Sequence, residues 1–344
     1  MNVKTAAGHI ARSRPRVLSI AGTDPSGGAG QSADVKTIGA LGGYAMSVLT
    51  SIVPQNTQGV TAIHVLDPRV LAEQFAAVFD DANSGASAVD AIKIGLVPDA
   101  ASADVVAEYL PLAGPGVPRV LDPVLVATSG HRLGPAVEIL TELARQADII
   151  TPNVPELAAL TGHEISCREE ALNAAAALAE STGAVVLAKG GHLDCGDEAV
   201  DALVGRPEQL GLTGGSELAS GSGLADGPEA ASGLAHVKRA GLAEQPAPAA
   251  QPAQPKVTSL GALAVVEFSG PRLVTRNTHG TGCTLSSALA TLRGRGMSWP
   301  QALGLAKPWM ARAISAGAAL GVGATDDSGR LLGHGPLDHF WHVD

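Results

Sequence analysis

The chain of 344 residues contains few aromatic side chains and few cysteines. Phenylalanine, tryptophan and tyrosine together make up 3% of the residues, whereas hydrophobic residues make up 45%. A buried core therefore has to be built from aliphatic side chains. The three cysteines, Cys167, Cys195 and Cys283, form no CxxC pair and leave one unpaired in any disulfide scheme. This usage argues against a disulfide framework and favours a reducing, cytoplasmic compartment.

Long uncharged hydrophobic runs are also missing. The most apolar long stretch, at 302–322, is interrupted by Lys307, Pro308 and Arg312, and the first fifteen residues lack the apolar segment of a secretory signal. Acidic residues outnumber basic ones by 33 to 23, which gives a formal net charge of −10. Because a surface of this sign repels phosphate backbones and anionic lipid, we expect neither nucleic acid nor a membrane as partner.

What the chain does contain is a regular alternation of short aliphatic runs with helical patterns rich in alanine and leucine. The predicted strands lie at 17–21, 46–53, 91–94, 119–121, 149–151, 184–188, 200–204, 262–268 and 273–275. The predicted helices among them include 70–80, 102–110, 135–146 and 169–181. Apolar strands that alternate with helices are typical of the α/β class, in which helices cover both faces of a mostly parallel sheet.

One segment lacks this alternation of strands and helices. Residues 206–258 contain no isoleucine, phenylalanine, tryptophan or tyrosine, and four prolines interleave with alanine and glutamine at 244–256. Such a sequence buries too little side chain to offset the entropy of ordering the backbone, about 1–2 kcal/mol per residue. We predict a single domain over 16–344, interrupted by a disordered insertion at 206–258 and preceded by a flexible tail at 1–15. A helix near 234–242 that docks on a neighbour is the alternative for the insertion.

The first predicted strand runs into a glycine-rich loop, GTDPSGGAG, at 22–30. Strand, loop and helix together favour anions and close approach of a ligand. Residues 28–33 satisfy the GxGxx(G/A) spelling of a dinucleotide site, but 36–66 contain no aspartate or glutamate to bind a ribose. The GxxxxGK(S/T) spelling fails because Gly28, not lysine, follows Gly27. A tight turn that uses glycine only for backbone freedom is the alternative.

A second glycine turn, NTHGTGCTLSSALATL, begins a predicted helix at 277–292. Gly280, Thr281 and Gly282 are candidates for an anion site, because a helix N-terminus offers free amides and about half a unit of positive charge. A transferring phosphoryl group needs such fixed donors. In the first turn of the helix, Cys283 is expected to have a depressed pKa and to accept a proton from a substrate hydroxyl. A small buried hydrophobic residue is the alternative for Cys283.

Eight segments in order resemble the hydroxymethylpyrimidine kinase/phosphohydroxymethylpyrimidine kinase family of thiamine biosynthesis, within the ribokinase-like superfamily. They are IAGTDPSGGAG (20–30), VPQNTQGV (53–60), KIGL (93–96), VLDPVLVATSG (120–130), ITPNVPELAALTG (150–162), LAKGGHL (187–193), NTHGTGCTLSSALA (277–290) and HGPLDHF (334–340). The resemblance implies one Rossmann-like domain that uses ATP with Mg²⁺. It implies phosphorylation of 4-amino-5-hydroxymethyl-2-methylpyrimidine and then of its monophosphate, by a cytoplasmic homodimer.

The resemblance also implies which residues bind the pyrimidine. Gln55 would hydrogen-bond the aminopyrimidine edge as donor and acceptor together. Asp34 would complement the ring nitrogen and the amino group. Gly22 would let the ring lie against the backbone, and Leu96 would pack on a ring face.

A second set of residues is implied for the nucleotide. Lys189, Asn153 and Thr278 would contact ATP phosphates. Asp122 and Glu156 offer hard oxygen ligands for Mg²⁺, through water. For these two carboxylates, a turn before a proline and a helix cap are the structural alternatives.

The chain departs from the family pattern at Gln31, Ser32, Pro54 and Leu96, which touch the expected pyrimidine pocket. A pyridoxine or pyridoxal kinase of the same superfamily is therefore the alternative function. A ligand-binding regulatory protein without catalysis is a more distant one.

Overall fold

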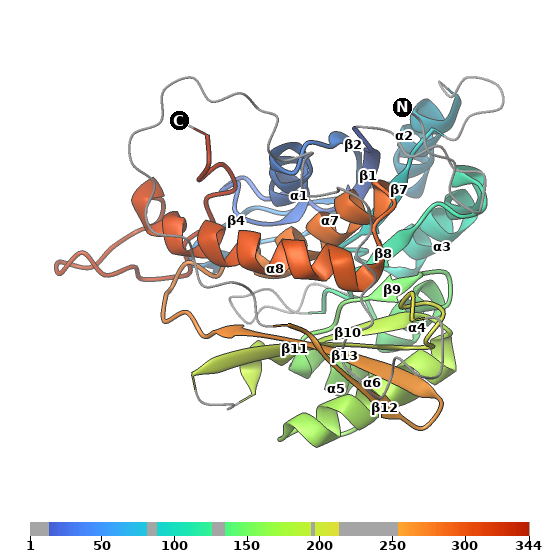
Figure 1. The fold of residues 1–344 in the computed structure, drawn as a ribbon. Helices are drawn as coiled ribbons and strands as arrows, with labels where there is room; N and C mark the ends of the chain where they lie inside the picture. Colours follow the sequence, from blue (N-terminus) through green and yellow to red (C-terminus); the bar gives the residue numbers. More distant parts are fainter. Residues whose placement is uncertain (1–13, 81–87, 126–134, 194–196, 213–253, 344) are drawn as a thin grey trace.

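A central sheet organises the computed structural model, which describes residues 14–80, 88–125, 135–193, 197–212 and 254–343 (Figure 1). Within these residues the sheet has nine strands in the order β12-β13-β11-β10-β9-β8-β7-β1-β2. Their bounds are β1 (Arg16–Ala21), β2 (Tyr44–Leu49), β7 (Ala91–Ile94), β8 (Arg119–Leu121), β9 (Ile149–Ile150), β10 (Val185–Lys189), β11 (Glu198–Gly205), β12 (Lys256–Leu260) and β13 (Leu263–Pro271). The strands from β2 to β10 pair in parallel, and the last three pair antiparallel. The predicted α/β class with a mostly parallel sheet is confirmed.

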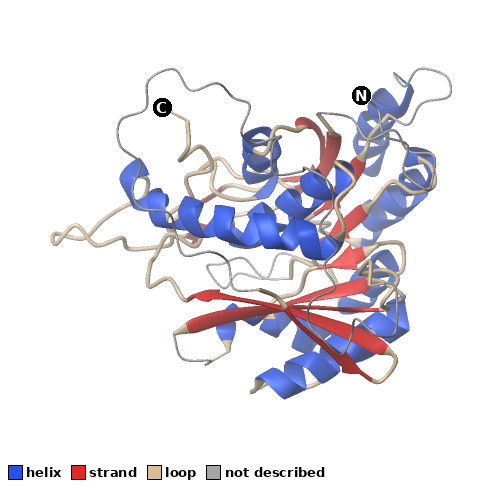
Figure 2. Ribbon diagram, viewed as in Figure 1, coloured by secondary structure: helices blue, strands red, loops and turns tan. Residues whose placement is uncertain are grey.

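Helices cover both faces of the sheet, as Figure 2 shows. One layer holds α1 (Gly30–Ala40), α7 (Thr281–Gly294) and α8 (Trp299–Ala316). The other holds α2 (Pro68–Asp80), α3 (Ala100–Tyr109), α4 (Val137–Ala144), α5 (Val154–Thr161) and α6 (Arg168–Thr182). Short 3-10 turns lie at Leu110–Ala113, Gly190–His192 and Gly317–Leu320.

Helices pack on both faces of the sheet because successive side chains of a strand point to opposite faces. In β1, Val17 packs into the cluster beneath α1, α7 and α8, and the next residue, Leu18, packs into the cluster beneath α2 to α6. Both clusters are mainly aliphatic, as the composition predicts. Among the described helices, none combines the length and the apolar character that a membrane span requires.

Two strand predictions are wrong. The predicted strand at 46–53 divides, because β2 ends at Leu49 and β3 (Ser51–Ile52) leaves the central sheet to pair with β6 (His64–Val65). A second small hairpin follows from β4 (Gln55–Asn56) and β5 (Gly59–Val60). No strand forms at 273–275: β13 ends at Pro271, and Val274 is 101% exposed. A β-branched residue favours a strand only where it packs against neighbours.

The insertion predicted at 206–258 is too long at both ends. Leu210 and Leu212 are buried in the core with α7 and α8, and β12 begins at Lys256 and pairs with β13. Residues 213–253, and with them the alternative helix at 234–242, lie outside the described residues, as do residues 1–13 of the predicted tail.

Candidate active site

The carboxyl ends of the parallel strands meet at one edge of the sheet, where α/β proteins commonly bind ligands. Gly22 follows β1, Leu96 lies two residues beyond β7, and Asp122 follows β8. Lys189 ends β10. The N-terminus of α7 lies beside this edge, because Gly282 in its first turn is close to Asp122 and Lys189.

The backbone of Gly282 leaves little space before these two groups. A Cβ atom built on Gly282 would lie 3.4 Å from Asp122 Oδ2 and 3.4 Å from Lys189 Nζ. Lys189 Nζ itself lies 3.3 Å from Asp122 Oδ1 and 3.9 Å from Glu156 Oε2. The first turn of α7 and the residues predicted for ATP and Mg²⁺ therefore form one cluster.

Burial and charge set the ionisation of this cluster. Burial raises the pKa of Glu156 to about 7, with Lys189 opposing the rise and Asp122 adding to it. For Lys189, burial acts to lower the pKa, but the two carboxylates outweigh it and raise the value. Lys189 is therefore a cation at neutral pH, which suits contact with phosphate.

The helix-cap alternative for Glu156 is observed. Asn153 Oδ1 accepts a hydrogen bond from the Glu156 N–H, and Glu156 Oε2 accepts one from the Asn153 N–H, both at 2.9 Å. This capping box fixes the first turn of α5. Asn153 and Glu156, predicted to bind ATP and Mg²⁺, therefore also stabilise the start of α5.

The carboxylates of Asp122 and Glu156 fit a hydrated Mg²⁺ ion. Among the described residues, no three acidic, histidine or cysteine side chains converge as a complete metal site. Mg²⁺ usually takes one or two carboxylates and completes its shell with water and substrate phosphates. Asp122 and Glu156 are only 2% and 6% exposed and both face Lys189, so they offer such a partial set.

Gly280 begins α7 in a conformation that requires glycine. Its φ is 85°, and a Cβ atom there would lie 1.9 Å from the Gly28 carbonyl oxygen. Within the described part of the chain, no side-chain hydrogen bond caps the helix at this position. The two glycine loops, far apart in sequence, therefore touch, and the start of α7 keeps backbone amides for an anion.

Cys283 is only partly exposed and accepts a hydrogen bond from the Gly30 backbone N–H. The predicted depressed pKa is wrong: burial raises the pKa of the Cys283 thiol to about 12. Lys93 opposes this rise, whereas Asp34 and Asp122 add to it. The helix N-terminus, with about half a unit of charge, does not offset the loss of water and two nearby carboxylates.

Three of the residues predicted for the pyrimidine lie together at the end of β1. A Cβ atom on Gly22 would lie 3.1 Å from Leu96 Cδ2. Gln55 donates from Nε2 to the carbonyl oxygen of Thr23, at 3.1 Å. Leu96 forms a small apolar cluster with Val53, separate from the two main cores. The arrangement provides an apolar wall next to a side-chain amide.

The structure contradicts a direct contact between Asp34 and a substrate. The Asp34 side chain is fully buried, and its Oδ2 accepts hydrogen bonds from Ser19 Oγ at 2.6 Å and Lys93 Nζ at 2.9 Å. Its Oδ1 accepts a hydrogen bond from Ser287 Oγ at 2.8 Å. Because α1 already begins at Gly30, Asp34 lies one turn inside the helix and faces the sheet.

The sequence reasoning missed two charged groups near the site, Lys93 and Asp24. Lys93 is buried in β7, and its signal is a lysine between Ile92 and Ile94 in an otherwise apolar strand. Asp24 Oδ2 lies 2.8 Å from His279 Nε2 and joins the two glycine loops. The signal of Asp24 is weaker, since an aspartate is ordinary in a loop.

Thr278, predicted for ATP, has a side-chain partner. Its Oγ1 lies 2.8 Å from His334 Nδ1, in the segment that follows α8. Its backbone carbonyl accepts a hydrogen bond from Thr281 Oγ1 at 3.2 Å. These contacts hold the turn before α7 in place.

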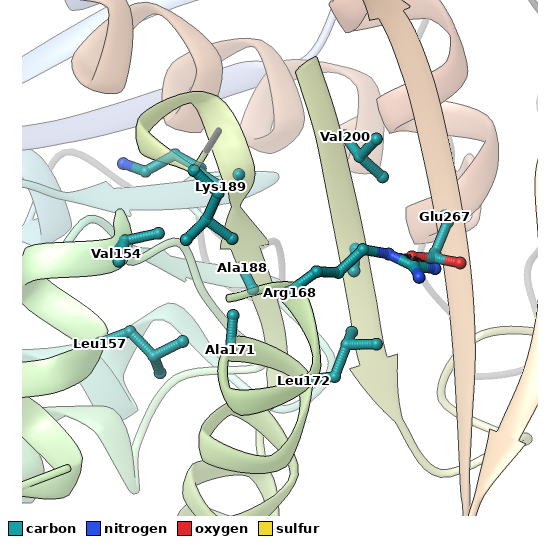
Figure 3. Close-up of a pocket in the computed structure, with 12 residues that line it drawn as sticks. Val154, Leu157, Arg168, Ala171, Leu172, Ala188, Lys189, Val200 and Glu267 are labelled. Atoms are coloured by element: carbon teal, nitrogen blue, oxygen red, sulfur yellow. Dashed lines mark hydrogen bonds and ion pairs between the residues drawn. The ribbon is translucent and has the colours of Figure 1, made fainter. Parts of the chain in front are cut away.

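A small cavity lies beside this cluster, between α5, α6, β10 and β11 (Figure 3). Its volume is about 20 Å³, and its wall is mainly apolar, with the Arg168–Glu267 ion pair at one end. The Lys189 side chain extends away from that ion pair in Figure 3. A space of this size suits one water molecule and is too small for a nucleotide.

The chain is similar in sequence to known proteins of one family. The sequence profile of the family described as phosphomethylpyrimidine kinase matches residues 24–232 and 257–327. The chain belongs to this family. It is 34% identical over 333 residues to the hydroxymethylpyrimidine/phosphomethylpyrimidine kinase of Escherichia coli K12, covering 95% of this chain and 98% of the relative. It is 38% identical over 330 residues to the thiamine biosynthesis multifunctional protein ThiED of Corynebacterium efficiens. That match covers 95% of this chain but only 35% of the relative, so the chain spans about a third of this longer protein.

Solved structures of the family and its neighbours share the fold. The crystal structure of phosphomethylpyrimidine kinase from Clostridium difficile 630 matches with a TM-score of 0.61 at 30% identity, covering 88% of this chain and all of that one. An ADP complex of Bacillus subtilis pyridoxal kinase matches with a TM-score of 0.64 at 24% identity, covering 95% of this chain and 97% of that one. The second likeness concerns the fold alone.

Proposed function

We propose that the chain transfers a phosphoryl group from ATP to the hydroxymethyl group of 4-amino-5-hydroxymethyl-2-methylpyrimidine, and then a second one to the monophosphate. The observation that carries this proposal is the position of Cys283. Its sulfur accepts a hydrogen bond from the Gly30 N–H, at the start of α1 and next to Gly22, and the neighbouring Gly282 lies close to Lys189 and Asp122. The relatives from Escherichia coli and Rhizobium meliloti are named as kinases of this kind.

The donor half of the reaction belongs to the cluster around Lys189. The ammonium and the first amides of α7 would bind the phosphates of ATP, with Asn153 and Thr278 as further polar contacts. Asp122 and Glu156 would hold Mg²⁺, which neutralises negative charge on phosphate oxygens when bound. Phosphoryl transfer needs mainly positioning and charge neutralisation, and these groups supply both.

The acceptor half belongs to the end of β1. Leu96 would pack on the ring, Gly22 would let it approach the backbone, and Gln55 would bond the aminopyrimidine edge. The substrate hydroxyl oxygen forms a bond to the γ-phosphorus while the bond to the bridging oxygen of ADP breaks. The hydroxyl proton passes to the sulfur of Cys283. Since the thiol is protonated at neutral pH, only the minor deprotonated form can act as this base.

The substitution Cys283→Ala tests this role. We expect kcat to fall by about 10²–10⁴-fold, the usual contribution of general-base catalysis, with the KM for ATP unchanged. The matched control is Cys167→Ala, because Cys167 is exposed and lies at the start of α6. Turnover by Cys283→Ala close to that of the control would show that the thiol is not the base.

A substrate panel separates the alternative functions. With ATP and Mg²⁺, the proposal requires that hydroxymethylpyrimidine yields both the monophosphate and the diphosphate. Turnover of pyridoxal without turnover of the pyrimidine would assign the chain to the vitamin B6 kinases instead. Ligand-induced thermal stabilisation without ADP formation would indicate a binding protein that has no catalytic activity.

The homodimer also belongs to the proposal, since it follows from the resemblance. Size-exclusion chromatography with light scattering measures the mass directly. A mass near 34.4 kDa, that of one chain, would contradict the dimer.

A further inference from the structure

Lys93 is a fully buried cation that the proposed reaction does not yet use. It lies in β7 with 0% of its side chain exposed, between Ile92 and Ile94 of the core. Its Nζ lies 2.9 Å from Asp34 Oδ2, and the Asp34 side chain is also 0% exposed. A buried pair of charges costs desolvation energy, and hydrophobic residues of similar volume often replace such pairs without loss of stability. Packing therefore does not explain why a lysine occupies this strand.

The pair is joined to α7 one turn beyond Cys283. Asp34 Oδ1 accepts a hydrogen bond from Ser287 Oγ at 2.8 Å, and Ser287 is four residues after Cys283 in the helix. Asp34 Oδ2 also accepts a hydrogen bond from Ser19 Oγ, and Ser19 is the register partner of Lys93 in the sheet. One network thus connects β1, β7, α1 and the first two turns of α7.

Charged groups on several elements influence the ionisation of Cys283. Lys93 from β7 and Lys189 from β10 favour its deprotonated form, while Asp34 from α1 and Asp122 after β8 oppose it. The Gly30 N–H adds a hydrogen bond that also favours the deprotonated form. After burial itself, Lys93 has the largest effect on the pKa of this thiol, so the cation outweighs its own partner Asp34.

Lys93 keeps its charge throughout the working range of pH. Burial acts to lower its pKa, but Asp34, Cys283 and Asp122 outweigh burial and raise it. The ammonium is therefore a fixed positive charge, and its three-dimensional position is set by Asp34.

We propose that Lys93 is a positioning residue for phosphoryl transfer, whose ammonium, fixed by Asp34, stabilises the sulfur of Cys283 while it is deprotonated. This inference rests on the proposed function of Cys283 as the base. It assigns Asp34 a role different from the substrate contact predicted from sequence. Asp34 holds the cation and partly cancels its charge.

The test measures the rate at which iodoacetamide alkylates Cys283 in the full chain, across pH, by mass spectrometry of its peptide. Only the thiolate is alkylated at a useful rate, so the rate reports deprotonation. Exposed Cys167 in the same sample is the internal control. The double variant Lys93→Met/Asp34→Asn removes both charges at nearly unchanged volume and is compared with wild type.

The double variant is expected to slow alkylation of Cys283 by about tenfold for each unit by which the pKa changes. Its kcat falls while its KM for ATP is unchanged. An alkylation rate of Cys283 equal to that of wild type, relative to Cys167, would overturn the inference.

Failure of the inference is distinguishable from failure of the proposed function. Full activity of Cys283→Ala would remove the base and, with it, the role of Lys93. Loss of activity in Cys283→Ala, together with wild-type alkylation and kcat in the double variant, would leave the base in place and overturn the inference alone. Circular dichroism and the melting temperature check that the double variant is folded.

Discussion

At the scale of single residues, Gly280 is a position with no room for a side chain. A Cβ atom would meet the Gly28 carbonyl oxygen at 1.9 Å, and the φ of 85° disfavours any L side chain. We expect Gly280→Ala to lower the free energy of unfolding by about 1–3 kcal/mol and to abolish turnover, because the first amides of α7 must move. Urea unfolding and a coupled ADP assay measure the two effects.

Gly39 provides the matched control for that substitution. It lies in α1, and a Cβ atom there would have no heavy atom of the described residues within 4 Å. Gly39→Ala is therefore expected to stabilise the protein by about 0.5–1 kcal/mol, through helix propensity, with kcat unchanged. Equal effects of the two substitutions on kcat would show that the conformation of Gly280 is not required.

Glu156 gives the folded protein a dependence on pH. Its pKa is raised to about 7 from an ordinary value of 4.5. The contribution of this group to stability is fully present below pH 4.5 and is lost as the pH rises through 7, because the folded state then holds a buried charge. We expect Glu156→Gln, which preserves the capping acceptor, to gain in melting temperature relative to wild type between pH 5 and pH 8. A constant difference across this range would contradict the raised pKa.

Single residues also show where prediction from sequence ends. The motif GTGC predicts an anion site and draws attention to Cys283, because glycine and a helix start are local features. The ionisation of Cys283 depends on Lys93, Asp34 and Asp122, which are remote in sequence. The direction in which Asp34 points depends on where α1 begins, and a shift of one turn converted an expected substrate contact into a buried ion pair.

At the scale of elements, the Asp24–His279 pair joins the loop after β1 to the loop before α7. Burial alone would raise the pKa of Asp24, but hydrogen bonds from His279 and Ser26 outweigh it and lower the value. A double-mutant cycle of Asp24→Asn and His279→Gln is expected to give a coupling energy of about 1–3 kcal/mol in urea unfolding. The kcat should fall in each variant, because the anion site loses its fixed position.

An exposed pair serves as the control for this cycle. Glu142 and Arg145 form an ion pair on the surface of α4. A cycle on this pair is expected to give about 0.3–0.5 kcal/mol and no change in kcat. A coupling energy at Asp24–His279 no larger than this would show that the two loops are held together by other contacts.

Helices and strands were predictable where their apolar pattern recurs along the chain. They were missed where packing against distant residues determines whether a strand forms. The apolar strands that form the parallel sheet, such as Ala91–Ile94, were found because burial on both faces leaves a continuous apolar run. The strand predicted at 273–275 does not form, since the side chain of Val274 is exposed and gains nothing from packing. β12 was missed because its sequence, KVTSL, follows a proline-rich segment and is only partly buried.

At the scale of the whole molecule, the core extends into the segment that the composition assigns to an insertion. Replacing residues 213–253 with a flexible linker of about ten residues is expected to leave the cooperative melting transition and kcat intact. Replacing 206–258 is expected to abolish the transition, because it removes buried Leu210 and Leu212 and more than half of β12. Loss of each buried leucine side chain lowers the free energy of unfolding by about 2–5 kcal/mol. Differential scanning calorimetry of both variants shows whether the dispensable segment is 213–253 or 206–258. Equal melting temperatures of the two variants would show that 206–212 and β12 are not required for folding.

The contact between the two glycine loops has a consequence for synthesis of the protein on the ribosome. Asp24 and His279 are separated by 255 positions, and Asp34 and Ser287 by 253. Contacts between residues so far apart in sequence form slowly, because closing a long loop costs chain entropy before the contact is made. A nascent chain that ends at β13 contains the nine strands of the sheet. It contains Asp24 and Asp34 but lacks their partners His279 and Ser287. Products of premature termination before α7 are therefore expected to carry no residual kinase activity.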